Sequence, residues 1–123
     1  MKNKKEDDLR ILKGSLIYCE DIELTLHRFG KNYEVFAHDR VFFHAVSMSL
    51  MQVGEIANKL SNEFKEQTNN QVNWYKLKAI RNLFAHAYSN VSKRHVWQFA
   101  TVFIPVYADF CRQEINKLNE QKN

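Results

Sequence analysis

One short segment of this 123-residue sequence gathers side chains that can hold a phosphate and move a proton: Arg81-Asn82-Leu83-Phe84-Ala85-His86-Ala87-Tyr88. On an α-helix, which advances about 100° per residue, Asn82 and His86 lie one turn apart on one face, with Lys78 a turn earlier. Arg81 and Tyr88 share the adjoining stripe. Arg81 and His86 lie about 140° apart, so one helix does not easily bring them together. Two copies facing each other across a dimer axis would place the arginine of one chain near the histidine of the other.

These residue types suit the cleavage of RNA without a metal ion. The imidazole of His86, with an ordinary pKa of about 6.5, can exchange a proton with a 2′-hydroxyl or with the leaving oxygen. Arg81 can hold a phosphate through two parallel hydrogen bonds and stabilise its developing charge, and Asn82 can orient either group. Lys78 would attract the RNA backbone. Spacing alone, however, favours the simpler interpretation that Arg81 and His86 are surface residues of an amphipathic helix.

The sequence does not contain residues at the spacing that a metal centre or a cofactor site would need. His27 and His38 each follow a glutamate by four residues, but neither the Glu-x-x-His pair of di-iron bundles nor a His-Glu-x-x-His motif occurs in the sequence. The sequence also contains no glycine-rich phosphate loop and no nucleophile elbow. We therefore expect no metal and no cofactor.

Composition predicts that the candidate residues lie on helices. Glycine (3) and proline (1) are scarce, which argues against sandwiches, barrels and glycine-rich nucleotide folds because those need frequent tight turns. The first predicted helix spans roughly 6–29, with Asp7 and Asp8 placing negative charge at its start and Gly30 capping its end. Its apolar stripe recurs at steps of three and four: Leu9, Leu12, Leu16, Cys19, Ile22, Leu26 and Phe29.

A second and a third helix follow. The second is predicted as one long helix, because an apolar stripe runs from Phe36 to Phe64 at helical spacing. The polar segment 67–71 has no apolar period and is predicted to be a loop. Asn73 is predicted to cap the third helix, which carries the candidate residues and ends near Tyr88.

The fourth predicted helix has an apolar face from Val96 to Phe110 and contains Pro105, which predicts a kink or a division into two shorter helices. Together the elements predict an all-α, antiparallel four- to five-helix bundle that forms one domain over residues 1–123. Two of the apolar stripes are wider than a four-helix core needs, which favours a homodimer. The residues that widen them are Phe42, Phe43, Trp97 and Tyr107.

The charge, the cysteine content and the lengths of the uncharged stretches indicate which partners and which cellular compartment the sequence favours. The formal net charge of +4 and the pI of about 9.1 are compatible with a polyanionic partner but carry little weight alone. Cys19 and Cys111 lack metal-ligand spacing and can form at most one disulfide, which indicates a reducing cytoplasm. The longest uncharged stretch, from Val96 to Ala108, is shorter than the roughly 20 apolar residues of a membrane span, so we expect no contact with a membrane.

Residues 81–88 resemble the Arg-x4-His-x-Tyr motif of the HepT-like toxins, a branch of the HEPN ribonuclease superfamily. The pattern of residues is similar over roughly residues 39–115. The first predicted helix is similar only in being an amphipathic helix. Outside the motif it rests on Gln52, Gly54, Glu55, Ala57, Asn58, Lys59, Leu60, Ser61, Asn73-Trp74 and Val96-Trp97.

The resemblance implies a HEPN-type bundle that works as a homodimer whose two motifs line a shared cleft. Arg81 and His86 are implied to be catalytic residues of a metal-independent endoribonuclease, with Asn82 as the supporting polar residue. The family is the toxin half of a type VII-like toxin–antitoxin pair, so the implied partners are RNA and a small nucleotidyltransferase antitoxin. In that pairing Tyr88 is implied to be the residue that the antitoxin modifies with AMP.

Two other interpretations stay open. The chain could be a catalytically weak HEPN nucleotide-binding, RNA-binding or scaffold module that acts with a nucleotidyltransferase, or a plain helical dimerisation domain. Among the residues that carry the resemblance, Gly54 is interpreted as a close helix contact and Glu55 as a structural hydrogen-bond or interface partner.

Overall fold

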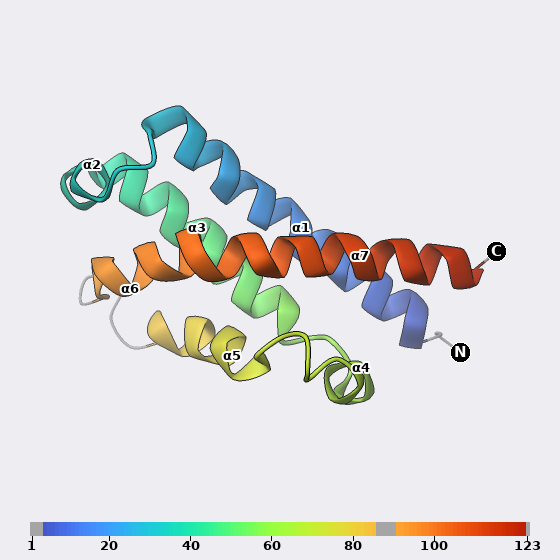
Figure 1. Cartoon of the computed structure of the whole chain (residues 1–123). Helices are drawn as coiled ribbons and strands as arrows, with labels where there is room; N and C mark the ends of the chain where they lie inside the picture. The colour runs from blue at the N-terminus through green and yellow to red at the C-terminus, as the bar shows by residue number, and fades with distance from the viewer. Residues whose placement is uncertain (1–3, 86–90, 123) are drawn as a thin grey trace.

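The structure is a computed structural model that describes residues 4–85 and 91–122 (Figure 1). In chain order the elements are α1 (Lys4–Phe29), α2 (Tyr33–His38), α3 (Arg40–Ala57), α4 (Asn62–Gln67), α5 (Trp74–Leu83), α6 (Lys93–Gln98), the π-helical turn η2 (Phe99–Phe103) and α7 (Ile104–Lys122). No strand occurs within the described ranges, and the predicted all-α class is confirmed.

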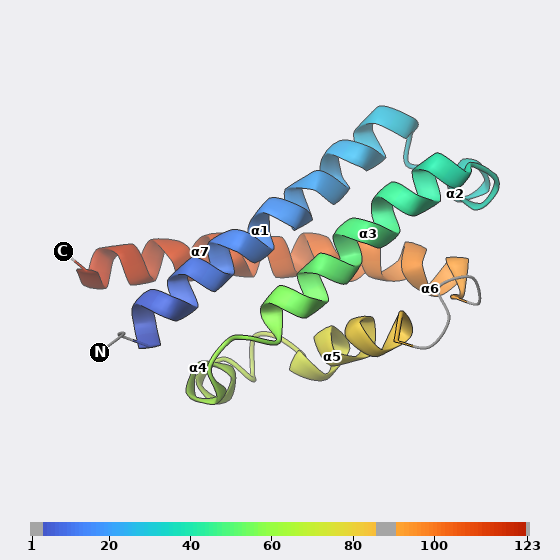
Figure 2. The same ribbon diagram turned by 180° about the vertical axis from the view of Figure 1, so that it is seen from behind.

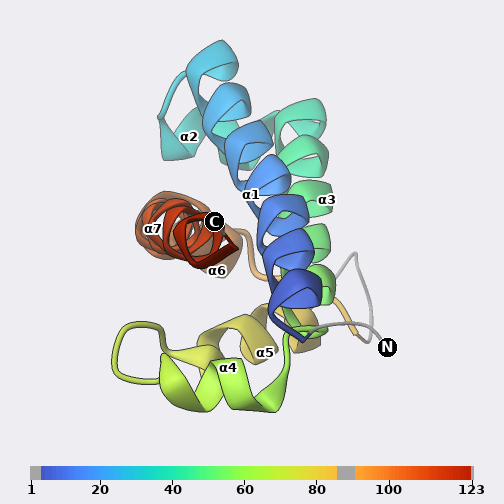
Figure 3. The same ribbon diagram turned by 90° about the vertical axis from the view of Figure 1, so that its right-hand side faces the viewer.

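The bundle is built from four helical segments: α1, α3, α5 and the continuous run from α6 through η2 into α7. Figures 1 and 2 show α1 and α3 running side by side in opposite directions, and these two helices share extensive contacts. Helix α7 packs against α1, while α6 and η2 pack against α3. Figure 3 shows α4 and α5 together at one end of the α1–α3 pair, where α5 rests on α3.

The first predicted helix is confirmed as α1, and its apolar stripe enters the core. Leu12, Cys19 and Ile22 are completely buried. The helix stops at Gly30, which has a φ of 92° and whose N–H donates to the carbonyl of Leu26 at 2.9 Å. Glycine adopts this left-handed conformation without a steric penalty, so it ends the helix as the sequence predicts.

The single long helix predicted from Phe36 to Phe64 is wrong, because two caps divide it into α2, α3 and α4. Asp39 has extended backbone angles, and its carboxylate accepts hydrogen bonds from the backbone N–H groups of the first turn of α3. Ser61 does the same for α4 by accepting from the N–H of Phe64 at 3.1 Å. The apolar period continues across both breaks, so periodicity alone concealed them.

Asp8 has a role that differs from the predicted one. It is buried, and its carboxylate accepts from both the backbone N–H and the hydroxyl of Ser61, at 2.9 and 2.7 Å. A charged acceptor satisfies two donors here, so the start of α1 is tied to the cap of α4. This contact joins the start of α1 to the connection between α3 and α4.

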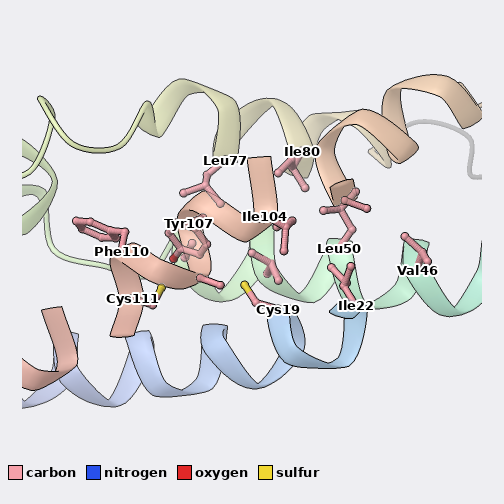
Figure 4. Packing of buried hydrophobic residues seen from close by; sticks show 14 of the residues in the cluster. Cys19, Ile22, Val46, Leu50, Leu77, Ile80, Ile104, Tyr107, Phe110 and Cys111 are labelled. Carbon is pink, nitrogen blue, oxygen red and sulfur yellow. The ribbon is translucent and has the colours of Figure 1, made fainter. Parts of the chain in front are cut away.

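Tyr107 and Phe42 belong to the core of a single chain. Tyr107 is only 1% exposed and lies within hydrogen-bond distance of the Ser15 hydroxyl at 3.1 Å, and Phe42 is completely buried. Figure 4 shows Tyr107 among the apolar residues between the helices. Two of the residues that widen the apolar stripes are therefore buried within a single chain, and these two give no support for a homodimer.

The two cysteines are buried and unbridged on α1 and α7 (Figure 4). Burial disfavours the thiolate, so it raises the pKa of Cys19 far above its ordinary range and that of Cys111 to about 12. Both side chains therefore act as small apolar groups of the core rather than as nucleophiles.

The predicted disturbance at Pro105 takes the form of the π-helical turn η2. The N–H of Ile104 donates to the carbonyl of Phe99, five residues earlier. Proline has no N–H to donate and its ring clashes with the preceding turn. The wider π-helical turn just before it accommodates the proline, so that α6, η2 and α7 form one continuous helical run. Within the described residues, no helix is both long enough and apolar enough to span a bilayer.

Candidate functional site

Helix α5 carries the candidate residues that the structure describes, and its start matches the prediction. The side chain of Asn73 accepts from the N–H of Tyr75 at 3.1 Å, so Asn73 is the N-cap. The indole N–H of Trp74 donates to the Thr68 hydroxyl at 3.2 Å, which anchors the first turn to the preceding loop. The predicted polar loop is thus fastened directly to the helix that presents the site.

The end of α5 differs from the prediction. The helix stops at Leu83 rather than near Tyr88, and the N–H of Ala85 bonds to the carbonyl of Asn82, three residues earlier, in a tighter turn. His86 and Tyr88 lie outside the described residues. The predicted one-turn alignment of Asn82 with His86 therefore falls partly outside the described residues.

Gly54 sets the distance between α5 and α3. A Cβ atom at this position would lie 3.2 Å from the side chain of Ile80 and 3.3 Å from the backbone nitrogen of Arg81. These distances are shorter than ordinary van der Waals contact, so glycine permits a backbone approach that a larger residue would oppose. The interpretation of Gly54 as a close helix contact is confirmed, and the contact falls on Arg81 itself.

Arg81 pairs with Glu55, the next residue along α3. The Arg81 Nε lies 3.0 Å from the Glu55 Oε1, and the two side chains are 45% and 54% exposed. Among the described residues, neither terminal nitrogen of Arg81 has a partner. The carboxylate therefore orients the guanidinium through one edge of a half-exposed side chain, and a guanidinium held in this way can bind a phosphate through its other nitrogens.

Lys78 and Asn82 lie on the same exposed side of α5 as Arg81. Lys78 also lines a cleft of about 340 Å³ between the end of α3, the start of α4 and the first turns of α5. The structure thus brings together a lysine, an arginine and an amide as expected. Glu55, interpreted from the sequence as a structural hydrogen-bond or interface partner, accepts a hydrogen bond from Arg81, which lies 26 residues away. No local pattern could identify that partner.

Metal ligands do not gather in the described part of the chain. No group of three or more histidine, cysteine, aspartate or glutamate side chains there is arranged to hold a metal ion. Glu55, the carboxylate next to Arg81, acts through an ion pair.

An all-α bundle with an oriented, solvent-facing arginine beside a lysine and an amide defines a candidate phosphate-binding surface. The chain belongs to the HepT-like family: the family model described as Ribonuclease HepT-like matches residues 16–114. The match confirms the resemblance and starts within α1, further toward the N-terminus than the segment from residue 39 on which it was based. No match to a curated protein or to a solved structure was found.

Proposed function

We propose that this protein is a metal-independent endoribonuclease, the toxin of a type VII-like toxin–antitoxin pair. The observation that carries the proposal is the ion pair between Arg81 and Glu55, which orients a half-exposed guanidinium on the same exposed side of α5 as Lys78 and Asn82. His86 follows in the sequence and supplies the acid–base group. The family match provides independent support for ribonuclease chemistry.

In the proposed reaction, the 2′-oxygen of the RNA attacks the adjacent phosphorus while the imidazole of His86 takes up the 2′-proton. The bond from phosphorus to the 5′-oxygen breaks, and that oxygen takes a proton from the imidazolium so formed and leaves as a 5′-hydroxyl. Arg81 stabilises the charge that develops on the phosphate oxygens, and Asn82 orients the reacting groups. The products are a 2′,3′-cyclic phosphate and a 5′-hydroxyl, and no step needs a metal.

The proposed site is completed by a second copy of the chain. Val41 and Met48 are 66% and 54% exposed on α3, and with Glu55 they recur every seven residues along one stripe. Seven residues are close to two helical turns, so these side chains form a line that leads to the Arg81 ion pair. Covering this stripe with a second α3 would bury apolar area and bring the two arginines to one cleft.

Cleavage of cellular RNA in the presence of EDTA tests the proposal. We expect purified protein to cut RNA in excess chelator at the rate seen without it, and to leave products ending in 2′,3′-cyclic phosphate. Product ends can be read by the resistance of the 3′ end to ligation before, but not after, the cyclic phosphate is opened and the resulting phosphate is removed. Absence of cleavage by a preparation whose intact mass shows no AMP would contradict the enzyme and favour the catalytically weak binding module.

Tyr88 is the proposed target of regulation by the partner nucleotidyltransferase. In this step the tyrosine oxygen attacks the α-phosphorus of ATP, and pyrophosphate leaves. The resulting phosphodiester adds negative charge and bulk to the motif, which would repel the RNA phosphate. We expect the mass of the protein to rise by one or more AMP units and cleavage to stop, whereas Tyr88→Phe should gain no AMP there. A tyrosine that stays unmodified while the partner is demonstrably active would count against this role.

A further inference from the structure

The amino-terminal half of α5 presents an aromatic side chain that the proposed cleavage step does not use. Tyr75 is 83% exposed, more than any other large hydrophobic residue of the described chain. Its neighbour Trp74 turns inward and packs against Phe64, Tyr107 and Phe110. The Tyr75 ring therefore stands on a rigid helix start while contributing little to the core.

Two hollows flank the Tyr75 ring. One is the cleft of about 340 Å³ that Lys65 and Lys78 line together with side-chain amides of α4 and the end of α3. The other, of about 350 Å³, is lined by residues 69–73 of the loop between α4 and α5, four of which carry amide side chains. Figure 3 shows this loop beside the start of α5. No carboxylate lines either hollow among the described residues.

The exposed stripe of α5 joins this region to the candidate catalytic residues. Tyr75, Lys78 and Asn82 lie at positions i, i+3 and i+7, so they form one line along the helix, with Arg81 beside its far end. From Tyr75 to Arg81 the helix rises about 9 Å. A stacked strand that rises about 3.4 Å per nucleotide covers this distance in two to three nucleotides.

We propose that Tyr75 and the two hollows form a subsite for single-stranded RNA, and this inference rests on the proposed endoribonuclease function. Tyr75 stacks on an unpaired base, Lys78 and Lys65 contact the neighbouring phosphates, and the amides of the loop reach the edge of the stacked base. Duplex RNA keeps its base faces covered, so the subsite selects unpaired segments. The base bound at Tyr75 lies two to three nucleotides from the cleaved phosphate.

Binding of a single-stranded oligonucleotide with 2′-O-methyl groups tests the subsite without cleavage, because the attacking hydroxyl is blocked. We expect Tyr75→Ala to weaken binding by about 5- to 150-fold, the range found for loss of one base–aromatic stack, and Tyr75→Phe to restore it. Lys78→Ala should weaken binding and lower the slope of log affinity against log salt by about 0.7. Fluorescence anisotropy across a salt series measures both effects.

Matched controls lie far from the subsite. Lys31 is an exposed lysine between α1 and α2, separated from Tyr75 by the whole length of α3, and Leu24 is an exposed apolar residue of α1. Lys31→Ala and Leu24→Ala should keep wild-type affinity. A fully paired duplex of the same sequence should bind wild type and Tyr75→Ala equally, and circular dichroism should show unchanged helix content, since Tyr75 lies outside the core.

The outcomes separate this inference from the proposed function. Equal affinity of wild type and Tyr75→Ala for the single strand would overturn the subsite even if wild type cleaves natural RNA. An equal loss for single strand and duplex would also overturn it, because stacking on an unpaired base would then not be the cause. If binding depends on Tyr75 but no preparation cleaves RNA, the subsite holds and the endoribonuclease function fails.

Discussion

Replacing His86 with alanine is expected to lower the rate of RNA cleavage by about 10²- to 10⁴-fold, the contribution of a positioned acid–base group. No other residue type in the motif has an ordinary pKa near neutral pH, so no other motif residue is expected to replace the imidazole. Initial rates on cellular RNA in EDTA, measured for both proteins at matched concentration, test this expectation.

His27 provides the control, because it is an exposed histidine in the last turn of α1 and far from α5 in the chain. His27→Ala should cleave RNA as the wild type does. Circular dichroism of both variants shows that helix content is unchanged. Cleavage at the wild-type rate by a clean His86→Ala preparation would remove His86 from the site, whatever the activity of the protein.

Replacing Arg81 with alanine is expected to lower cleavage by about 10²- to 10³-fold, as for other donors that stabilise developing charge. Arg81→Lys keeps the positive charge but loses the planar guanidinium, which can bind Glu55 through one edge and a phosphate through the other. The cleavage rate of Arg81→Lys should therefore stay well below that of the wild type. The loss should appear in kcat as well as in KM, because the guanidinium acts most strongly in the transition state.

Glu55 should behave as a positioning residue for Arg81. Glu55→Ala removes the acceptor of the 3.0 Å hydrogen bond and is expected to lower kcat about 2- to 10-fold, the worth of one net hydrogen bond. Glu55→Gln keeps an oxygen acceptor and should recover most of that loss. If Gln and Ala at this position behave alike, Glu55 does not act through Arg81.

Arg112 is the matched arginine control. It also forms ion pairs on the surface, with Glu20, Glu23 and Asp109, but it lies on α7 against α1. Arg112→Ala should leave cleavage unchanged. Wild-type cleavage by Arg81→Ala would contradict the catalytic role, and an equal loss in Arg112→Ala would indicate a general effect of surface charge.

Local features of the sequence were sufficient to predict several elements. Asn73 and Gly30 were predicted as the start and the end of helices because capping depends on a residue and its nearest neighbours. The stripe of α1 was predicted because a periodic apolar pattern needs no knowledge of its partner. The family was recognised from the motif at 81–88, and the match over residues 16–114 confirms it.

Other features escaped prediction because they depend on how α3, α4 and α5 pack. The break before α4 exists because Ser61 caps that helix and is itself held by Asp8, which lies 53 residues away. Helix α5 ends at Leu83, before the predicted end near Tyr88. Periodicity could not reveal either event, since the apolar pattern continues beyond both.

The sequence by itself determined the all-α class, the identity of the family and the residue types available for chemistry, because periodicity, caps and a short motif are local properties. Only the tertiary structure decided that Glu55 orients Arg81 and that Gly54 lets α3 approach the backbone beside it. It also decided that Tyr75 stands between two hollows near that arginine. These relations arise when helices distant in sequence pack against one another, and the spacing of residues along the chain does not contain them.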